Sequence, residues 1–191
     1  MSTEIVVKGN PPVSVMVTKR NKEVDDSIEK FLSNLNAAKV IGLDIEWSLI
    51  RESDGVTRSK IALLTLCDGT HCLIVQLPHL DSVPKSLFNF LHLPDYTFVG
   101  FDIVKNMDKL EKEYGFGCKN YVDLRTMAAK CDYSPFWGSA RMTERFCCAG
   151  VIDKPKSAVF DDWGNINLNE DQVNHATLNV FAYRQIGFFL S

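Results

Sequence analysis

The sequence predicts an α/β fold, a mixed β-sheet flanked by helices in a single domain. Short alternating apolar runs dominate the first half of the chain, and segments with helical spacing dominate the second half. A turn signal, Asp68-Gly69-Thr70, indicates an antiparallel hairpin, whereas the later strands are separated by helices, which is typical of parallel crossovers. The 191 residues are 46% hydrophobic, enough for one sizeable core, so we expect a single domain over residues 1–191.

The expected strands are defined by alternation and by the turn residues between them. Asn10-Pro11-Pro12 separates the first two, and a polar stretch over residues 51–59 is expected to be an excursion between the third and the fourth. We expect strands at residues 5–8, 13–19, 40–47, 61–67, 71–77 and 97–101.

Capping residues and apolar spacing define the expected helices. Asp25-Asp26 precedes a run with helical spacing, Gly115 ends another, and Asp123 and Asn169 stand where N-caps are expected. We expect helices at residues 25–34, 86–91, 103–114, 124–130 and, with a weaker pattern, 140–149, and a last helix from residue 170 nearly to the C-terminus.

Composition restricts the possible classes of function. The net charge of −3 argues against binding of nucleic acid by bulk charge, although it leaves room for a local basic groove. The N-terminus lacks a signal peptide and the six cysteines lack zinc-site spacing, so we expect an intracellular protein, in cytoplasm or nucleus, with reduced thiols. The sequence has no run of 18 apolar residues, so we expect no membrane-spanning helix.

Asp44 and Glu46 are the most informative residues. In a strand over residues 40–47, alternation puts Ile41, Leu43, Ile45 and Trp47 on one apolar face and places both carboxylates side by side on the other. Like charges two residues apart repel, and a divalent cation would hold them together. The alternative is an ordinary half-buried strand whose polar face meets water.

Further motifs accompany the acidic pair in a fixed order along the chain. They are Val99-Gly100-Phe101-Asp102-Ile103 with Lys109-Leu110, then Asp123-Leu124, then Lys154-Pro155-Lys156-Ser157 and Asp162-Trp163, and finally His175-Ala176-Thr177-Leu178-Asn179. Together with Asp44-Ile45-Glu46, this series resembles the 3′–5′ exonuclease domain of the DEDD superfamily, in its Werner-syndrome-like branch. The resemblance covers about residues 13–190. It implies a ribonuclease-H-like fold and hydrolysis of nucleic acid with Mg²⁺ or Mn²⁺.

The chain departs from the family pattern at three positions. The resemblance places Asn106 and Asn179 where the family has metal-binding aspartates, and His175 where it has a tyrosine. Only Asp44 and Glu46 of four carboxylates then remain. An amide oxygen can coordinate a metal but brings no charge, and a lost unit charge near a cation costs up to about 4 kcal/mol at an effective dielectric near 20.

Two nearby residues are candidates to complete such a site. Asp102 lies one turn before Asn106 and is either a substitute metal ligand or the cap of the helix that follows. His175 lies one turn before Asn179 and is either a group that orients or deprotonates the attacking water or a buried, hydrogen-bonded histidine.

Basic and aromatic residues around these motifs are candidates for strand binding. Trp47 and Phe101 would stack a terminal base or fill the core, and for Trp47 the core is favoured. Trp137 and Trp163 are better candidates for a substrate rim or a subunit contact. Backbone-phosphate contacts, or merely solvated positions, are expected for Lys105, Lys109, Arg141, Arg145, Lys154 and Lys156.

The sequence therefore favours a 3′–5′ exonuclease-family domain that binds single-stranded RNA or DNA at its 3′ end. If it is active, Asp44, Glu46 and Asp102 would hold metal, with Asn106, His175 and Asn179 completing the catalytic site. The alternative is a catalytically silent member kept as a nucleic-acid-binding or assembly subunit. Since some small relatives close into rings, we expect a homo-oligomer.

Overall fold

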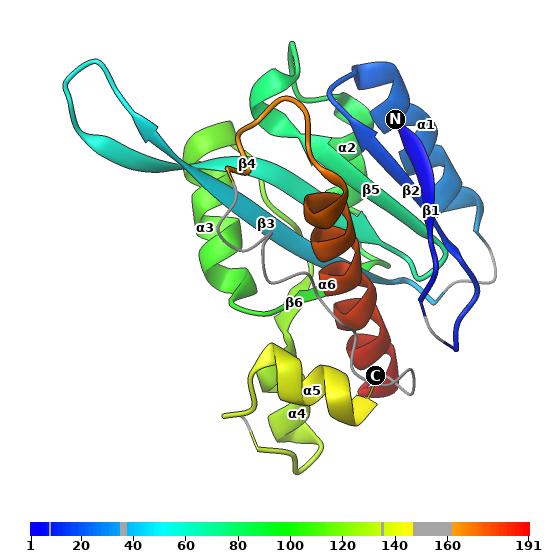
Figure 1. Ribbon diagram of the computed structural model, residues 1–191. Helices are drawn as coiled ribbons and strands as arrows, with labels where there is room; N and C mark the ends of the chain where they lie inside the picture. The colour runs from blue at the N-terminus through cyan, green and yellow to red at the C-terminus, as the bar shows by residue number, and fades with distance from the viewer. Residues whose placement is uncertain (8, 35–37, 135, 147–161) are drawn as a thin grey trace.

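A seven-stranded mixed sheet forms the centre of the molecule (Figure 1). The computed structural model describes residues 1–7, 9–34, 38–134, 136–146 and 162–191. In the order β1-β2-β5-β4-β3-β6-β7, the pairs β1/β2, β5/β4 and β4/β3 are antiparallel and the other three are parallel. The strands are β1 (Ser2–Ile5), β2 (Val13–Thr18), β3 (Val40–Arg51), β4 (Thr57–Cys67), β5 (His71–Gln76), β6 (Thr97–Gly100) and β7 (Tyr121–Asp123). The predicted α/β fold with a mixed sheet is confirmed.

Helices cover both faces of this sheet. On one face the core side chains of β3, including Ile41, Leu43 and Ile45, pack in one cluster with residues of the first three α-helices. On the other face the C-terminal helix crosses the sheet, as Figure 1 shows. The helices are α1 (Asn21–Ser33), η1 (Leu77–His79), α2 (Lys85–Leu91), α3 (Ile103–Tyr114), α4 (Leu124–Lys130), α5 (Ser139–Phe146) and α6 (Glu170–Phe189). No helix in these described ranges is long and apolar enough to cross a membrane.

A close approach at Gly42 fixes the position of α6 over β3. A Cβ atom at Gly42 would lie 1.9 Å from the carbonyl oxygen of Val180, so only glycine allows the helix to pack at this depth. Gly42 lies two residues before Asp44, and Asn179 precedes Val180. The same contact therefore brings the acidic end of β3 and the middle of α6 together.

Several boundaries follow the expected caps. α3 occupies Ile103–Tyr114 and ends at Gly115, which adopts a positive φ of 74°. The Asp123 side chain caps α4 by accepting from the Arg125 amide, and Asn169 forms a capping box with Gln172 at the start of α6. These starts and the end at Gly115 agree with the sequence prediction.

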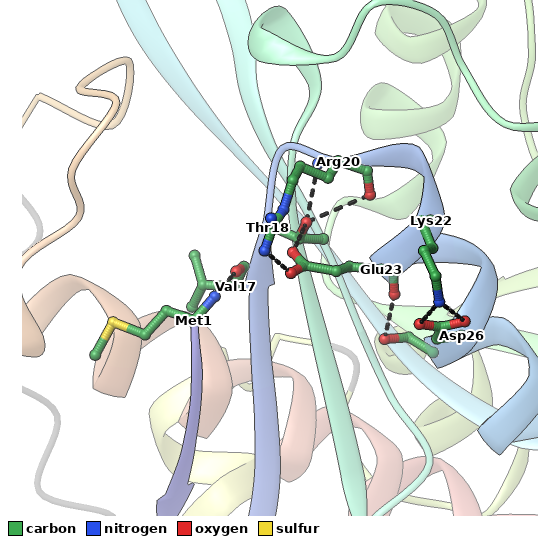
Figure 2. Close-up of polar contacts among 8 residues, drawn as sticks. Met1, Val17, Thr18, Arg20, Lys22, Glu23 and Asp26 are labelled. Atoms are coloured by element: carbon green, nitrogen blue, oxygen red, sulfur yellow. Dashed lines mark hydrogen bonds and ion pairs between the residues drawn. The ribbon is translucent and has the colours of Figure 1, made fainter.

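The start of α1 was predicted four residues too late, because its first turn is held by side chains upstream of Asp25. The Thr18 hydroxyl accepts from the Arg20 amide at 2.9 Å and donates to the Glu23 carboxylate at 2.5 Å (Figure 2). Arg20 also pairs with Glu23, which lies in the first turn. A favourable acidic group at the helix N-terminus thus replaces a conventional N-cap.

The polar stretch over residues 51–59 is strand at its two ends, Arg51 and residues 57–59, so the expected excursion shortens to residues 52–56. β3 continues to Arg51 and β4 begins at Thr57, so the two form a long hairpin that projects beyond the sheet (Figure 1). Arg58 pairs with Glu52 and Asp54 across its tip. The pairing register shifts where Glu46 pairs with Leu63 and Trp47 with Ile61, which leaves Ala62 as an extra residue on β4.

Two other boundaries differ from expectation. The first strand is Ser2–Ile5 rather than residues 5–8, because it pairs with β2 in the register Ser2 to Met16. α5 begins at Ser139, and its expected end near residues 149–150 lies outside the described residues.

Candidate active site

A cleft of about 810 Å³ opens where β3 leaves the sheet between α3 and α6. The end of β3, the start of α3 and the first residues of α4 and α5 each contribute side chains to it. It is lined by Asp44, Ile45, Glu46, Trp47, Ser48, Leu49, Phe101, Asp102, Lys105, Asn106, Arg125, Ser139, Asp162, Trp163 and Tyr183.

Asp44 and Glu46 lie on the cleft wall with an amide from each of two helices nearby. The Asn179 Nδ2 group of α6 donates to Asp44 Oδ2 at 3.3 Å. Asn106, in the second turn of α3, lines the same cleft, and both asparagines are only 6% exposed. The structure thus brings together four of the positions selected from the sequence. They are held by the packing of α6 on β3 and by the entry of α3 from β6.

Asp102 lines the cleft, and its predicted use as a metal ligand stays a prediction. It stands at the N-cap position of α3, but its side chain makes no capping hydrogen bond. Instead its carboxylate pairs with Arg125 at 3.0 Å, and the Arg125 guanidinium lies 5.1 Å from the centre of the Phe101 ring. The backbone of Asp102 has φ of 50°, a left-handed conformation that is unfavourable for most residues with a side chain. The cap interpretation is therefore wrong, and the cleft carries an arginine that sequence reasoning did not select.

His175 does not line the cleft. It lies one turn before Asn179, and its ring packs 5.9 Å from the ring of Trp163, which itself lines the cleft. Its predicted part in positioning water stays a prediction.

Tyr183 occupies the cleft side of α6 instead, one turn after Asn179. Burial, with the negative charges of Asp44 and Glu46 adding to it, holds the pKa of the Tyr183 phenol well above its usual range. The group is therefore a hydrogen-bond donor and not a base at neutral pH. The four-residue spacing from Asn179 was the signal in the sequence that could have identified it.

Trp47 is not a core residue. It keeps the predicted side of β3, but the strand runs past the helices there and leaves the indole 41% exposed at the cleft. The Lys109 Nζ lies 4.9 Å from the centre of the Trp47 ring, and it also pairs with Glu113 at 2.7 Å and donates to the Ser59 carbonyl at 2.7 Å. Lys109 therefore supports the indole.

The remaining aromatic and basic candidates are distributed over two places. Phe101 is 7% exposed and packs edge-on against Tyr183, while Trp163 is 5% exposed and belongs to the core beneath α6, so both line the cleft from buried positions. Lys105 is exposed at the cleft. Arg141 and Arg145 lie with Trp137 on a second, smaller hollow. Lys154 and Lys156 lie outside the described residues.

The residues present fit a hard divalent cation in part. Two carboxylates and two amide oxygens are suitable ligand types for Mg²⁺ or Mn²⁺. Within the part of the chain that the structure describes, no group of three or more His, Cys, Asp or Glu side chains is close enough to hold a metal. Since the Asp102 carboxylate pairs with Arg125, its predicted use as a third ligand would require that this pair open.

The site is therefore an acidic pair on an interior strand of a mixed sheet, in a cleft faced by helix-borne polar groups. A family profile described as 3′–5′ exonuclease matches residues 20–187. The chain therefore belongs to the 3′–5′ exonuclease family, of DEDD type.

Individual relatives agree with this assignment. A 3′–5′ exonuclease from Arabidopsis thaliana is 28% identical over 178 residues, which are 88% of this chain and 60% of the relative. The crystal structure of Escherichia coli RNase D, an exoribonuclease involved in structured RNA processing, aligns with a TM-score of 0.77 at 21% identity over 92% of this chain and 44% of that one. The catalytic core of RRP6 from Trypanosoma brucei gives a TM-score of 0.75 at 14% identity, with 98% and 48% covered.

These structural similarities establish an RNase D-like exonuclease fold. The chain spans between a quarter and three fifths of the length of curated relatives that it matches.

Proposed function

We propose that the chain binds the 3′ end of single-stranded RNA or DNA in the cleft and hydrolyses its last phosphodiester with Mg²⁺ or Mn²⁺. The observation that supports this most is that Asp44, Glu46 and Asn106 line one cleft, with Asn179 donating to Asp44, in a chain of the exonuclease family. We further infer that the chain belongs to the Werner-syndrome-like branch and that the two asparagines stand in place of metal-binding aspartates.

The cleft residues divide between strand binding and hydrolysis. Lys105 and Arg125 lie on one wall, where they would bind phosphate oxygens of the strand, Arg125 with the part of its guanidinium that Asp102 leaves available. The exposed indole of Trp47, supported by Lys109, offers a flat surface for the terminal base. Asp44 and Glu46 would hold the divalent ion, which when bound supplies activation of water and stabilisation of the leaving oxygen. Tyr183 would donate a hydrogen bond beside them.

The charge of the site indicates slow hydrolysis. Asp44 and Glu46 together supply two negative charges, which offset one divalent ion but not two. Each absent charge weakens metal binding by up to about 4 kcal/mol at a dielectric near 20, or roughly three orders of magnitude in affinity. We therefore expect activity that requires millimolar Mn²⁺ or Mg²⁺.

A second candidate function is a catalytically silent subunit that binds strands or assembles as a homo-oligomer. The Asn179 Nδ2 contact with Asp44 favours it, because an amide N–H already supplies a positive partner to this carboxylate. On this alternative, the amide takes the place of the ion.

Release of 3′ nucleotides from a 5′-labelled single strand tests hydrolysis. Activity in Mn²⁺ should be abolished by Asp44→Asn and by EDTA, and unchanged by Asp81→Asn, which alters an exposed carboxylate away from the cleft. Equal rates for the unchanged chain and Asp44→Asn would exclude hydrolysis at this site. Strand binding measured in parallel then distinguishes the silent subunit, which binds strands without cleaving them, from a protein that does neither. Light scattering gives the oligomeric state.

A further inference from the structure

The second hollow, of about 280 Å³, is lined by Trp137, Arg141, Glu144 and Arg145. We infer that it binds a nucleobase and phosphate of the same single strand, upstream of the 3′ end held in the cleft. This inference rests on the proposed function and extends it by a second binding subsite.

One helix borders both the cleft and the hollow. Ser139, the first residue of α5, lines the cleft, while Arg141 and Arg145 line the hollow. Arg141 and Arg145 are four residues apart and therefore share one side of α5, whereas Ser139 lies about 200° round the helix from Arg141. A strand that leaves the cleft past Ser139 would therefore pass round the first turn of α5 to reach the hollow.

Each arginine of the hollow lies over an aromatic ring. The Arg141 guanidinium is 5.1 Å from the centre of the Trp137 ring, and the Arg145 guanidinium is 5.7 Å from that of Tyr133. Tyr133 packs against Trp137 at 5.8 Å and edge-on against Phe146 at 4.9 Å, which fixes the orientation of both rings. The result is a preformed surface of planar groups, the kind on which unpaired bases stack.

Charge and exposure favour a nucleic-acid strand as the occupant. The two arginines exceed the one glutamate, so the hollow carries an excess positive charge in a chain whose net charge is −3. Arg141 and Arg145 are exposed on α5. Next to Trp137, Phe136 is 94% exposed, which adds a further aromatic side chain at the rim. Alternating arginine and aromatic groups match both the phosphates and the bases of a single strand.

Strand length separates this subsite from the cleft. Fluorescence anisotropy would compare a labelled dinucleotide, which fills only the cleft, with a 10-nucleotide strand of the same base, both with phosphorothioate linkages that resist hydrolysis. The unchanged protein should bind the longer strand more tightly. Trp137→Ala should weaken binding of the longer strand at least about fivefold, the lower end for loss of one stacked base, and leave the dinucleotide unaffected.

Two arginine variants keep the test valid if Trp137→Ala fails to fold. Arg141→Ala and Arg145→Ala alter exposed side chains, and each should lower the salt dependence of binding to the longer strand by about 0.7 in a log–log plot. Lys112→Ala, which removes an exposed cation from the last turn of α3, should change neither strand.

The outcomes separate the two proposals. Absence of binding to either strand overturns the proposed function together with the subsite. Three results overturn only the subsite. They are equal affinity of the unchanged protein for the short and the long strand, an equal loss of affinity for both strands in the variants, and a changed oligomeric mass of the variants. The last of these results would indicate a contact between copies of the chain.

Discussion

Replacing Asn179 by aspartate tests the electrostatics of the cleft most directly. In the structure the Asn179 amide donates to Asp44 Oδ2 at 3.3 Å, and its side chain is buried with 6% exposed. Asn179→Asp keeps the shape but substitutes a second carboxylate for the donor. Two unit charges at 3.3 Å repel by about 5 kcal/mol at an effective dielectric near 20.

The pH and the presence of a divalent metal determine how much of this repulsion remains. Protonation of one carboxylate offers relief, and for an ordinary carboxyl at pH 7 it costs about 4 kcal/mol, which limits the loss of stability. For a chain of this length, about 4 kcal/mol corresponds to a decrease of roughly 10 °C in melting temperature. A divalent ion between the carboxylates should reverse the loss, because it binds only the folded state.

The measurement is thermal denaturation in EDTA and in about 5 mM Mn²⁺. This concentration is near the roughly millimolar affinity expected of a two-carboxylate site. We expect Asn179→Asp to melt well below the unchanged chain in EDTA and to gain more from Mn²⁺ than the unchanged chain does. Asn167→Asp, at an exposed position before α6, is the matched control and should respond as the unchanged chain does. Equal melting in EDTA, together with equal gains from Mn²⁺, would refute the reasoning that these groups share one electrostatic site.

Three further perturbations test other parts of the structure. Burial, with Lys30 adding to it, lowers the pKa of His71 below its usual 6.5, so folding favours the neutral ring. The free energy of unfolding should therefore be full above about pH 6.5 and fall as the pH decreases. Urea denaturation from about pH 8 to 5 should show a smaller decrease for His71→Phe. Gly42→Ala forces a Cβ to 1.9 Å from the Val180 carbonyl and should cost about 3 kcal/mol or more, measured by urea denaturation. Asp102→Gly should be neutral or stabilising, since glycine accepts φ of 50°, whereas Asp102→Ala should cost about 1 kcal/mol; equal stabilities of the two variants would contradict a strained backbone there.

The sequence predicted those elements whose ends are specified locally. Gly115 and the N-caps Asp123 and Asn169 act on their own helix, so their signals are complete within a few residues. The start of α1 depends instead on a network from Thr18 across the turn, and the hairpin from residue 40 to residue 67 depends on pairing between distant strands. The pairing of the two strands is not contained in a short window of sequence. The Thr18–Glu23 network is local, but it starts the helix without a side-chain N-cap, which is why the capping pattern did not identify it.

The same distinction applies to the cleft. The motif order predicted that Asp44, Glu46, Asn106 and Asn179 share one site, because each lies at a fixed place on its element. Alternation also gave the correct side for Trp47 but not its exposure, which depends on how far β3 extends beyond the helices that cover it.

Tyr183 and Arg125 were missed for a related reason. The position of α6 over the cleft depends on its close approach to Gly42, and Arg125 meets Asp102 only because α4 folds back beside the start of α3. The spacing of Tyr183 from Asn179 was visible in the sequence, but its position in the cleft and the pairing of Arg125 with Asp102 are consequences of tertiary packing.

The extra residue Ala62 determines which side chains of β4 face each side of the sheet. Ala62 and Leu63 both belong to the core beneath α6, so the side chains of β4 exchange sides at this point. Deleting Ala62 would turn residues 57–61 over and withdraw Ile61 from the opposite core. Inserting or deleting two residues at the hairpin tip would leave each side chain of β3 and β4 on its present face of the sheet. Deleting the single residue Ala62 would move the side chains of β4 beyond it to the opposite face.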